Sequence, residues 1–368
     1  MSNSWPDSAV MMTLSGLANS SDISGQLQNT NYATQGDWSV VWGPYNDSYG
    51  NLAYVTKSAS TGNYALAIRG SETNISFNAL YNWFFDFYVT WQSPWPYLID
   101  APQARISRGA WDQASNLTIA TWNGQTLGNF LTQSIPASAT VYVTGHSLGG
   151  NLASVLASWI SFQRGPSGST PDPNTVVYTF AAPSAGNTGF ADGFNLRLPN
   201  SYRYWNSLDA IPRAWDHLLQ LNSIYEGIGI STPGWVQDTV DGLDALLLTS
   251  ELEYGSFYLQ PNGGGTELSG SAAPAVTDYL NEVIYQHNVN VYLGLLGAPL
   301  IVPIAQPNLA LATATRASLK GDFLPRPIIE RQKAIEKAQL QTITGLADLP
   351  HLLPGGAISP RAFNQSGY

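Results

Sequence analysis

The stretch ATVYVTGHSLGGNLASVLASW, residues 139–159, decides the fold. A β-rich run ends at Thr144, and an amphipathic helical pattern begins within two residues of Ser147. Between them lies Gly-His-Ser-Leu-Gly, residues 145–149, which matches the Gly-x-Ser-x-Gly pattern of a nucleophile elbow. The bare pattern is weak, but a preceding strand and a following helix are its required context. The sequence therefore predicts Ser147 as a nucleophile.

The residue types around Ser147 fit this chemistry. A serine on a sharp strand-to-helix turn has a strained backbone, and bulky side chains at Gly145 and Gly149 would collide with neighbouring elements. The N-terminus of the following helix supplies unpaired N–H donors and partial positive charge where an oxyanion would form.

Strand-like and helix-like runs alternate outward from this stretch, which predicts an α/β protein with a mainly parallel sheet and helices on both faces. Helical periodicity lies between residues 106 and 133 and again after Ser147. The expected strands are Trp38–Trp42, Leu52–Thr56, Tyr64–Ile68, Thr140–Thr144, Thr175–Phe180 and Tyr202–Trp205.

A lone hydroxyl is a weak nucleophile, so an elbow serine needs an acid and a histidine base further along the chain. The chain has four histidines. His146 lies inside the elbow, His217 follows the best acid candidate too closely to face it, and His351 lies in a proline-rich stretch. The sequence therefore predicts His287 as the base, just before an apolar run that resembles the last helix of the core.

Asp209 is the predicted acid, because it comes directly after a predicted strand, in a loop containing Pro212. Sheets of this type place functional loops at the carboxyl ends of their strands. Asp216, Asp238 and Asp241 are rivals: the first falls on a following turn, and the other two fall in a helical pattern.

Composition excludes several other classes of protein. Only 11% of the 368 residues are charged and the net charge is -10, which disfavours nucleic acid and anionic membranes as partners. Cysteine is absent, so thiol catalysis and Cys-ligated metals are excluded. No run is long and apolar enough to span a membrane. The low charge content is typical of a secreted protein, although the N-terminal residues lack a signal-peptide pattern.

At five places the chain resembles the class 3 lipases, the fungal-type triacylglycerol lipase family of the α/β-hydrolase fold. The five segments are ALAIRGSETN (65–74), VTGHSLGGNLA (143–153), YTFAAPSAGNTGF (178–190), YRYWNSLDAIPR (202–213) and HNVNVYL (287–293). Two positions depart from the family pattern: Ala181 replaces its glycine, and Ser184 replaces its usual arginine. Both positions lie outside the predicted triad.

The resemblance implies a Ser-His-Asp triad of Ser147, His287 and Asp209, and an oxyanion hole made by the main-chain N–H groups of Ser71 and Leu148. The implied reaction is acyl transfer through an acyl-enzyme, for which no cofactor is needed. No Asp and Gly pattern of a calcium loop is seen, so no metal is predicted.

The segment between Phe77 and Tyr97 contains ten aromatic residues. The family places its lid here, a helix that covers the site and exposes an apolar face at lipid interfaces, so we expect a helical lid at about residues 74–98. A buried core helix is the alternative. The expected lid or acyl-chain contacts are Phe77, Tyr81, Phe84, Phe85, Tyr88 and Trp91.

The sequence thus predicts an α/β-hydrolase catalytic domain over residues 1–300 and a C-terminal extension over residues 301–368 with one helix. The extension carries a net charge of +3, from 7 basic and 4 acidic residues, which favours packing on the acidic body. A loosely attached extension is the alternative, because exposed charge pairs contribute little. The expected activity is that of a triacylglycerol lipase acting on a lipid or small ester. Phospholipase A1 and short-chain or feruloyl-type esterase stay open, as does a non-catalytic lipid-binding protein with this fold. Oligomeric state cannot be read from the sequence.

Overall fold

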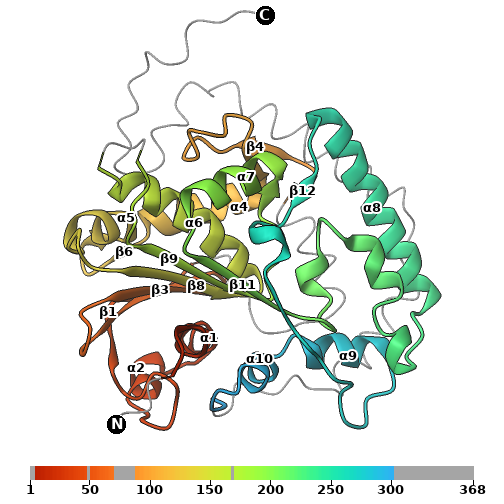
Figure 1. The fold of residues 1–368 in the computed structure, drawn as a ribbon, viewed down its shortest axis with the longest axis horizontal. Coiled ribbons are helices and arrows are strands. Elements are labelled where there is room, and N and C mark those ends of the chain that lie inside the picture. The colour runs from red at the N-terminus through yellow and green to blue at the C-terminus, as the bar shows by residue number, and fades with distance from the viewer. Residues whose placement is uncertain (1–4, 48–49, 70–87, 167–169, 302–368) are drawn as a thin grey trace, which may run out of the picture.

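The computed structural model describes residues 5–47, 50–69, 88–166 and 170–301, which form a three-layered α/β/α structure (Figure 1). The described α-helices are α1 (Asp7–Leu17), α2 (Ile23–Leu27), α4 (Arg108–Ile119), α5 (Leu127–Asn129), α6 (Leu148–Arg164), α7 (Thr188–Arg197), α8 (Gly234–Tyr254), α9 (Tyr279–Gln286) and α10 (Val289–Leu295). A π-helical turn, η1 (Phe130–Ser134), follows α5, and four 3₁₀ turns come later: η2 (Ile211–Arg213), η3 (Leu218–Asn222), η4 (Glu226–Ile228) and η5 (Asn262–Gly264).

The central sheet has seven strands in the order β1-β2-β3-β8-β9-β11-β13. The first three strands pair antiparallel, and the pairs from β3 to β13 are parallel. The strands are β1 (Trp38–Asn46), β2 (Leu52–Ser58), β3 (Tyr64–Arg69), β8 (Val141–His146), β9 (Thr175–Phe180), β11 (Ser201–Asn206) and β13 (Thr266–Leu268). All six predicted strands are confirmed, as is the mainly parallel α/β architecture.

The parallel strands are apolar on both faces because helices cover both. In β3 the side chains of Leu66 and Ile68 pack in the core beneath α6, whereas Ala65 and Ala67 pack in the core beneath α1. Every residue of α6 from Leu148 to Ser161 is buried. This all-round burial fits a helix held between the sheet and α4.

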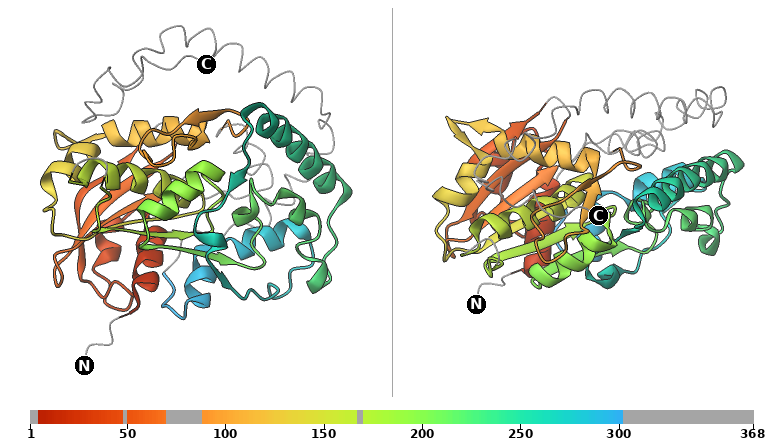
Figure 2. Two further views of the ribbon diagram at one scale, coloured as in Figure 1. Left: turned by 45° about the horizontal axis from the view of Figure 1, so that its top comes forward. Right: turned by 90° about the horizontal axis from the view of Figure 1, so that it is seen from above.

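The face opposite α6 is covered by α1, α2 and α10, a layer that the turned views in Figure 2 also show. The sequence analysis did not identify α1. Its Met11, Met12 and Leu14 are at most 1% exposed, and complete burial of such a side chain stabilises the fold by about 1.5–3 kcal/mol. The Ser15 hydroxyl also forms a 2.8 Å hydrogen bond with Thr144 at the end of β8. The helix therefore packs directly beneath the strand that leads to Ser147.

A second, small sheet has the strand order β12-β10-β5-β4 and lies beside the helical layer. Its strands are β4 (Gln92–Pro94), β5 (Arg105–Ser107), β10 (Gly186–Asn187) and β12 (Tyr258–Leu259), and β6 (Thr121–Trp122) pairs with β7 (Gln125–Thr126) in a separate hairpin. Thus the helical pattern expected between residues 106 and 133 begins with a strand and is interrupted by this hairpin.

The prediction of a helical lid is wrong for residues 88–98. Tyr88 is in a turn with φ of +41°, and β4 pairs antiparallel with β5. The physical reason is that Pro94 and Pro96 cannot continue a helix, while β5 offers a pairing partner. Trp95 also donates a 2.8 Å hydrogen bond from its indole to Ser158 Oγ of α6. The remainder of the predicted lid, residues 74–87, lies outside the described residues.

The one helix predicted for the C-terminal extension lies outside the described residues. Within the described part, no helix is long and apolar enough to cross a membrane.

Candidate active site

Ser147 lies at the turn between β8 and α6. Its backbone has φ of 62° and ψ of −134°, a conformation that costs energy for any residue with a side chain. The Ser147 N–H donates a 2.9 Å hydrogen bond to the carbonyl of Phe180 at the end of β9. The sheet thus holds the strained turn in place, as the elbow pattern predicts.

Gly145 is required by the close approach of the first turn of α6. A Cβ atom built on Gly145 would lie 2.1 Å from the carbonyl oxygen of Gly149. A Cβ on Gly150 would lie 2.7 Å from the Cβ of Ala182. The helix can therefore begin immediately after Ser147 only because these positions lack side chains.

Asp209 and His287 come together from distant parts of the chain. Asp209 follows β11, and His287 is the residue at which α9 ends. Nδ1 of His287 lies 2.7 Å from Oδ2 of Asp209, and both side chains are fully buried. This is the geometry in which a carboxylate fixes the orientation of an imidazole.

The Asp209 carboxylate is fully engaged by other donors. The main-chain N–H of Ile211 donates to Oδ1 at 3.0 Å, and the Tyr292 hydroxyl donates to Oδ2 at 2.7 Å. The same hydroxyl accepts a 3.0 Å hydrogen bond from the main-chain N–H of Asn206, which directs its proton towards Asp209. Burial of this carboxylate is thus offset by charge-assisted hydrogen bonds.

His287 presents its other nitrogen, Nε2, with no hydrogen-bond partner among the described residues. Its ring lies 4.6 Å, centroid to centroid, from the ring of His146, the residue immediately before Ser147. The imidazole that Asp209 orients therefore lies next to the elbow.

His146 is held neutral by its surroundings. Burial lowers its pKa well below the usual value, and the nearby His287 lowers it further, while a hydrogen bond to the His287 main chain opposes the shift. The His146 ring beside His287 is therefore uncharged.

The His287 helix is tied to the Asp209 loop by amide groups. Asn206 Nδ2 donates to Gln286 Oε1 at 2.7 Å, and Gln286 Nε2 donates to Glu282 Oε1 at 2.7 Å. Tyr292, Asn206 and Gln286 were not among the predicted site residues. The signal available for Tyr292 was a lone hydroxyl in the apolar run that follows His287.

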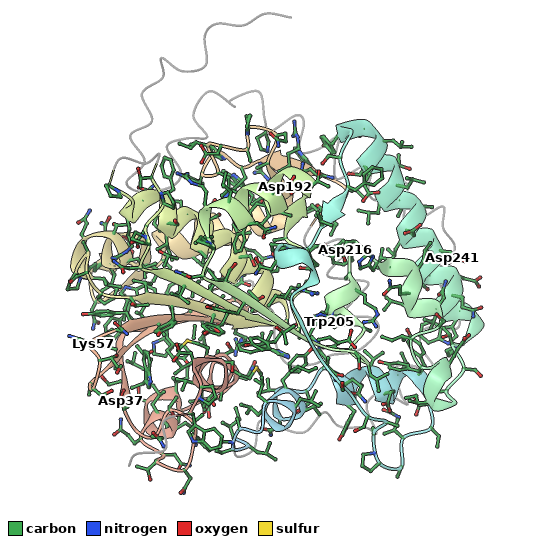
Figure 3. All side chains as sticks on the ribbon, in the orientation of Figure 1. Asp37, Lys57, Asp192, Trp205, Asp216 and Asp241 are labelled. Atoms are coloured by element: carbon green, nitrogen blue, oxygen red, sulfur yellow. The ribbon has the colours of Figure 1, made fainter. Side chains whose placement is uncertain are left out.

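The rival residues lie elsewhere. Asp238 and Asp241 are exposed on α8, and Figure 3 shows Asp241 on the outer side of this helix. Asp216 lies between α8 and the sheet, where His217 Nε2 is 4.0 Å away, but the His217 side chain is 58% exposed. The Asp216 carboxylate is buried, but its Oδ1 has no hydrogen-bond partner among the described residues, and its histidine is exposed, unlike the fully buried 2.7 Å contact of Asp209 and His287.

Of the remaining predicted site residues, Leu148 and Trp91 lie within the described residues and the others lie outside them. Leu148 provides the first amide of α6, and the Ser147 side chain does not cap that helix. Trp91 lies beside Arg108, whose guanidinium carbon is 5.6 Å from the indole centroid. Ser71, Phe77, Tyr81, Phe84, Phe85 and His351 lie outside the described residues. Within the described residues, no group of three or more His, Cys, Asp or Glu side chains could hold a metal ion.

Known lipases resemble this chain in sequence and in fold. Residues 65–217 match the family model for class 3 lipases. M37 lipase superposes with a TM-score of 0.67 at 26% identity, over 84% of this chain and 97% of that protein. Lipase ZK262.3 of Caenorhabditis elegans is 39% identical over 72 residues, which are 20% of this chain and only 19% of that relative. The chain therefore has an α/β-hydrolase fold and is similar to class 3 lipases over residues 65–217.

Proposed function

We propose that the protein is a serine carboxylic-ester hydrolase, and specifically a lipase, in which Ser147, His287 and Asp209 form the catalytic triad. One observation carries the proposal: the buried 2.7 Å contact between Asp209 and His287, with Nε2 of His287 left unpartnered beside the strained elbow. Similarity to class 3 lipases over residues 65–217, and to M37 lipase, supports the same chemistry.

In the proposed reaction, Nε2 of His287 accepts the Ser147 hydroxyl proton while Ser147 Oγ attacks the ester carbonyl. The imidazolium then gives this proton to the departing alcohol, which leaves an acyl-enzyme. Water, activated by the same nitrogen, hydrolyses the acyl-enzyme and releases the carboxylic acid. Asp209 stabilises the imidazolium without taking its proton.

The oxyanion of each tetrahedral intermediate would be bound by the main-chain N–H groups of Leu148 and Ser71. Support for Leu148 comes from its place at the first turn of α6, where the amides of a helix lack internal partners. Ser71 follows from the family resemblance of ALAIRGSETN.

We further propose that acyl lipid is the substrate and that residues 74–87 contribute a cover. Exposed apolar side chains of Leu248, Leu252 and Phe257 offer support, because they lie near the C-terminal end of α8. Hydrogen bonds from Ser250 Oγ to the Thr90 carbonyl, and from Gln92 to the Ser256 carbonyl, tie this end of α8 to the chain that follows residue 87.

Hydrolysis of p-nitrophenyl esters of graded acyl length, with emulsified triglyceride and phosphatidylcholine in parallel, tests the function. A lipase releases fatty acid from long-chain emulsions, with Ser147→Ala as the inactive control. Preference for phosphatidylcholine would identify a phospholipase A1, and activity confined to short or feruloyl esters would identify an esterase. No hydrolysis of any ester would leave a lipid-binding protein with this fold.

Replacing Phe84 and Phe85 with Ser tests the cover. The double variant should lose activity on long-chain emulsions and keep activity on short esters, because the triad is unchanged. Tyr202→Ser is the control, since Tyr202 is a 44% exposed aromatic on β11 outside the predicted lid. Equal loss on both substrates, together with a lowered melting temperature, would contradict a movable cover.

A further inference from the structure

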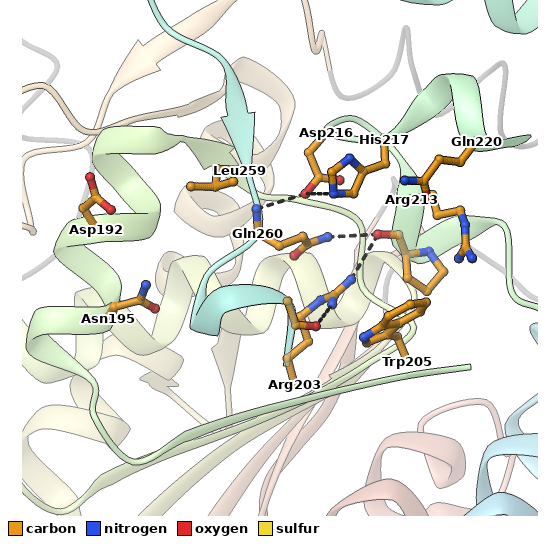
Figure 4. Close-up of a pocket in the computed structure, with 12 residues that line it drawn as sticks. Asp192, Asn195, Arg203, Trp205, Arg213, Asp216, His217, Gln220, Leu259 and Gln260 are labelled. Carbon is orange, nitrogen blue, oxygen red and sulfur yellow. Dashed lines mark hydrogen bonds and ion pairs between the residues drawn. The ribbon is translucent and has the colours of Figure 1, made fainter. Parts of the chain in front are cut away.

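Gln260, just after β12, uses both hydrogens of its side-chain amide on main-chain carbonyls. Nε2 donates to the carbonyl of Ala182 at 3.0 Å and to the carbonyl of Pro212 at 3.2 Å. The side chain is buried, with 7% of its surface exposed. Figure 4 shows Gln260 between Asp216 and Arg203.

The two carbonyls belong to different arms of the active site. Ala182 lies two residues after Phe180, whose carbonyl accepts the N–H of Ser147. Two residues further on, the Ser184 carbonyl accepts a 3.1 Å hydrogen bond from Asn151 of α6. The loop that contains Ala182 is therefore fixed to the nucleophile elbow and to its helix.

Pro212 belongs to the other arm, three residues after Asp209, in the turn η2. Its carbonyl also accepts a 3.1 Å hydrogen bond from Arg203 Nη2, and the other terminal nitrogen of Arg203 donates to the Gly264 carbonyl. Arg213 donates to the Ser207 carbonyl at 2.9 Å. The acid loop is thus held on one side by arginines. Two links join it directly to the Ala182 loop: Ser184, whose main-chain N–H and hydroxyl donate to the Ala214 carbonyl at 2.9 Å and 3.3 Å, and the Gln260 amide at Pro212.

Gln260 is itself held firmly. Its main-chain N–H donates a 3.1 Å hydrogen bond to Asp216 Oδ2, and the preceding residue Leu259 pairs with Gly186 across β12 and β10. The amide is therefore anchored at its backbone before it bridges the two loops.

A cavity of about 530 Å³ lies beside this bridge, lined by Gln260, Arg203, Trp205 and Asp216 among others (Figure 4). A different side chain at residue 260 can adjust its position within this cavity. Water from the cavity can bond to the Ala182 or Pro212 carbonyl when the amide donor is removed. Loss of the amide should therefore loosen the geometry between the two loops more than it disrupts the core.

We propose that Gln260 is a positioning residue for the reaction, whose side-chain amide, at the Pro212 end of the acid loop, fixes the distance between that end and the loop that follows the nucleophile elbow. The inference rests on the proposed triad. Misplacement of a catalytic group by about 1 Å can cost on the order of 10²-fold in rate, so a small shift at this bridge is enough to matter.

The test uses Gln260→Met, which keeps length and volume but has no donor, and Gln260→Glu, which keeps shape and offers acceptors to two carbonyls. Gln220→Met and Gln220→Glu are matched controls, because Gln220 lines the same cavity from η3 but is exposed. A fluorophosphonate probe counts reactive serines in each preparation, and kcat and KM on a soluble ester are expressed per labelled site.

We expect the Gln260 variants to label to the full extent, with kcat lowered about 10- to 100-fold and KM little changed, and the Gln220 variants to match the native protein. A purely structural role would instead lower the melting temperature and the labelled fraction while leaving kcat per site unchanged, which would overturn the proposal. Failure of both Gln260 variants to fold would also overturn it. Absence of labelling in the native protein would refute the triad itself, which is a separate outcome.

Discussion

Asp209 is a fully buried carboxylate whose two oxygens accept hydrogen bonds from a main-chain amide and a tyrosine and face an imidazole. Its position could be predicted from the sequence, because it follows a strand in a recognisable loop. Tyr292 could not, since it lies 83 residues away along the chain and its role depends on how α10 packs under the acid loop. Pairwise contacts over such separations leave no local pattern in the sequence.

Tyr292→Phe removes the hydroxyl that bridges Asp209 and the Asn206 amide. Losing these buried partners should lower the free energy of unfolding by about 1–3 kcal/mol. It should also lower kcat, because Asp209 is free to rotate away from His287. Urea denaturation and ester hydrolysis measure the two effects. Tyr285→Phe is the control, since Tyr285 is 37% exposed, and an equal loss in both variants would contradict the role given to Tyr292.

His146 makes stability depend on pH. Its pKa is lowered in the folded state by burial and by His287, so below the ordinary histidine value of about 6.5 the unfolded chain binds a proton that the folded chain refuses. The stability present above pH about 6.5 should therefore be lost progressively as the pH falls. Urea melts between pH 7 and pH 5 should show a weaker pH dependence for His146→Asn than for the native protein. Parallel curves for the two proteins would contradict the buried neutral state.

At the scale of an element, the elbow was predictable because its constraints are local. Gly145 and Ser147 lie at the turn that requires them. The residues on either side of the turn have the patterns of a strand and of a helix, so both elements could be predicted. The segment 88–98 was not predictable in the same way. Its aromatic spacing fits a helix. The segment instead forms the strand β4, because β4 pairs with β5 and the Trp95 indole donates a hydrogen bond to Ser158 of α6.

Ala181 illustrates a departure from the family pattern whose consequence only the backbone reveals. Its φ is +55°, in the left-handed region that favours glycine. The backbone of Ala181 is therefore strained, by about 1–3 kcal/mol for a residue with a Cβ. Ala181 directly follows Phe180, whose carbonyl accepts the N–H of Ser147.

Gly145→Ala tests the close contact at the elbow. The added Cβ would lie 2.1 Å from the Gly149 carbonyl oxygen, so the turn must open, and we expect loss of activity and several kcal/mol of destabilisation. Gly242→Ala in α8 is the control, because no atom lies within 4 Å of its added Cβ. That change should stabilise the protein by about 0.5–1 kcal/mol. Melting temperatures that move in the same direction for both variants would contradict this account.

At the scale of the whole molecule, the alternation of strands and helices predicted the layers but not the strand order. Adjacent β3 and β8 are separated by more than 70 residues, and their pairing depends on long-range packing. For the same reason the helix α1, with no motif of its own, was missed although it covers one face of the sheet. The choice among the acidic residues was a prediction from loop position, and the structure brings Asp209 rather than its rivals to His287.

Truncation after residue 303 tests whether residues 1–303 contain the whole catalytic apparatus. Ile301 must be retained, because it is 2% exposed and its N–H and carbonyl both bond to Asn290. The truncated protein should hydrolyse a soluble short ester with the kcat of the full chain. A truncated protein with a normal circular dichroism spectrum and no such activity would show that residues 304–368 supply a catalytic part.

The central claim is that Ser147 is activated by His287 and Asp209. The most direct measurement is the rate of fluorophosphonate labelling, with the modified residue located by mass spectrometry in the native protein and in the Ser147→Ala and Asp209→Asn variants. The account predicts one label on Ser147, no label in Ser147→Ala, and labelling slowed by several orders of magnitude in Asp209→Asn. Rapid labelling of a different serine, or ester hydrolysis that survives in Ser147→Ala, would contradict it.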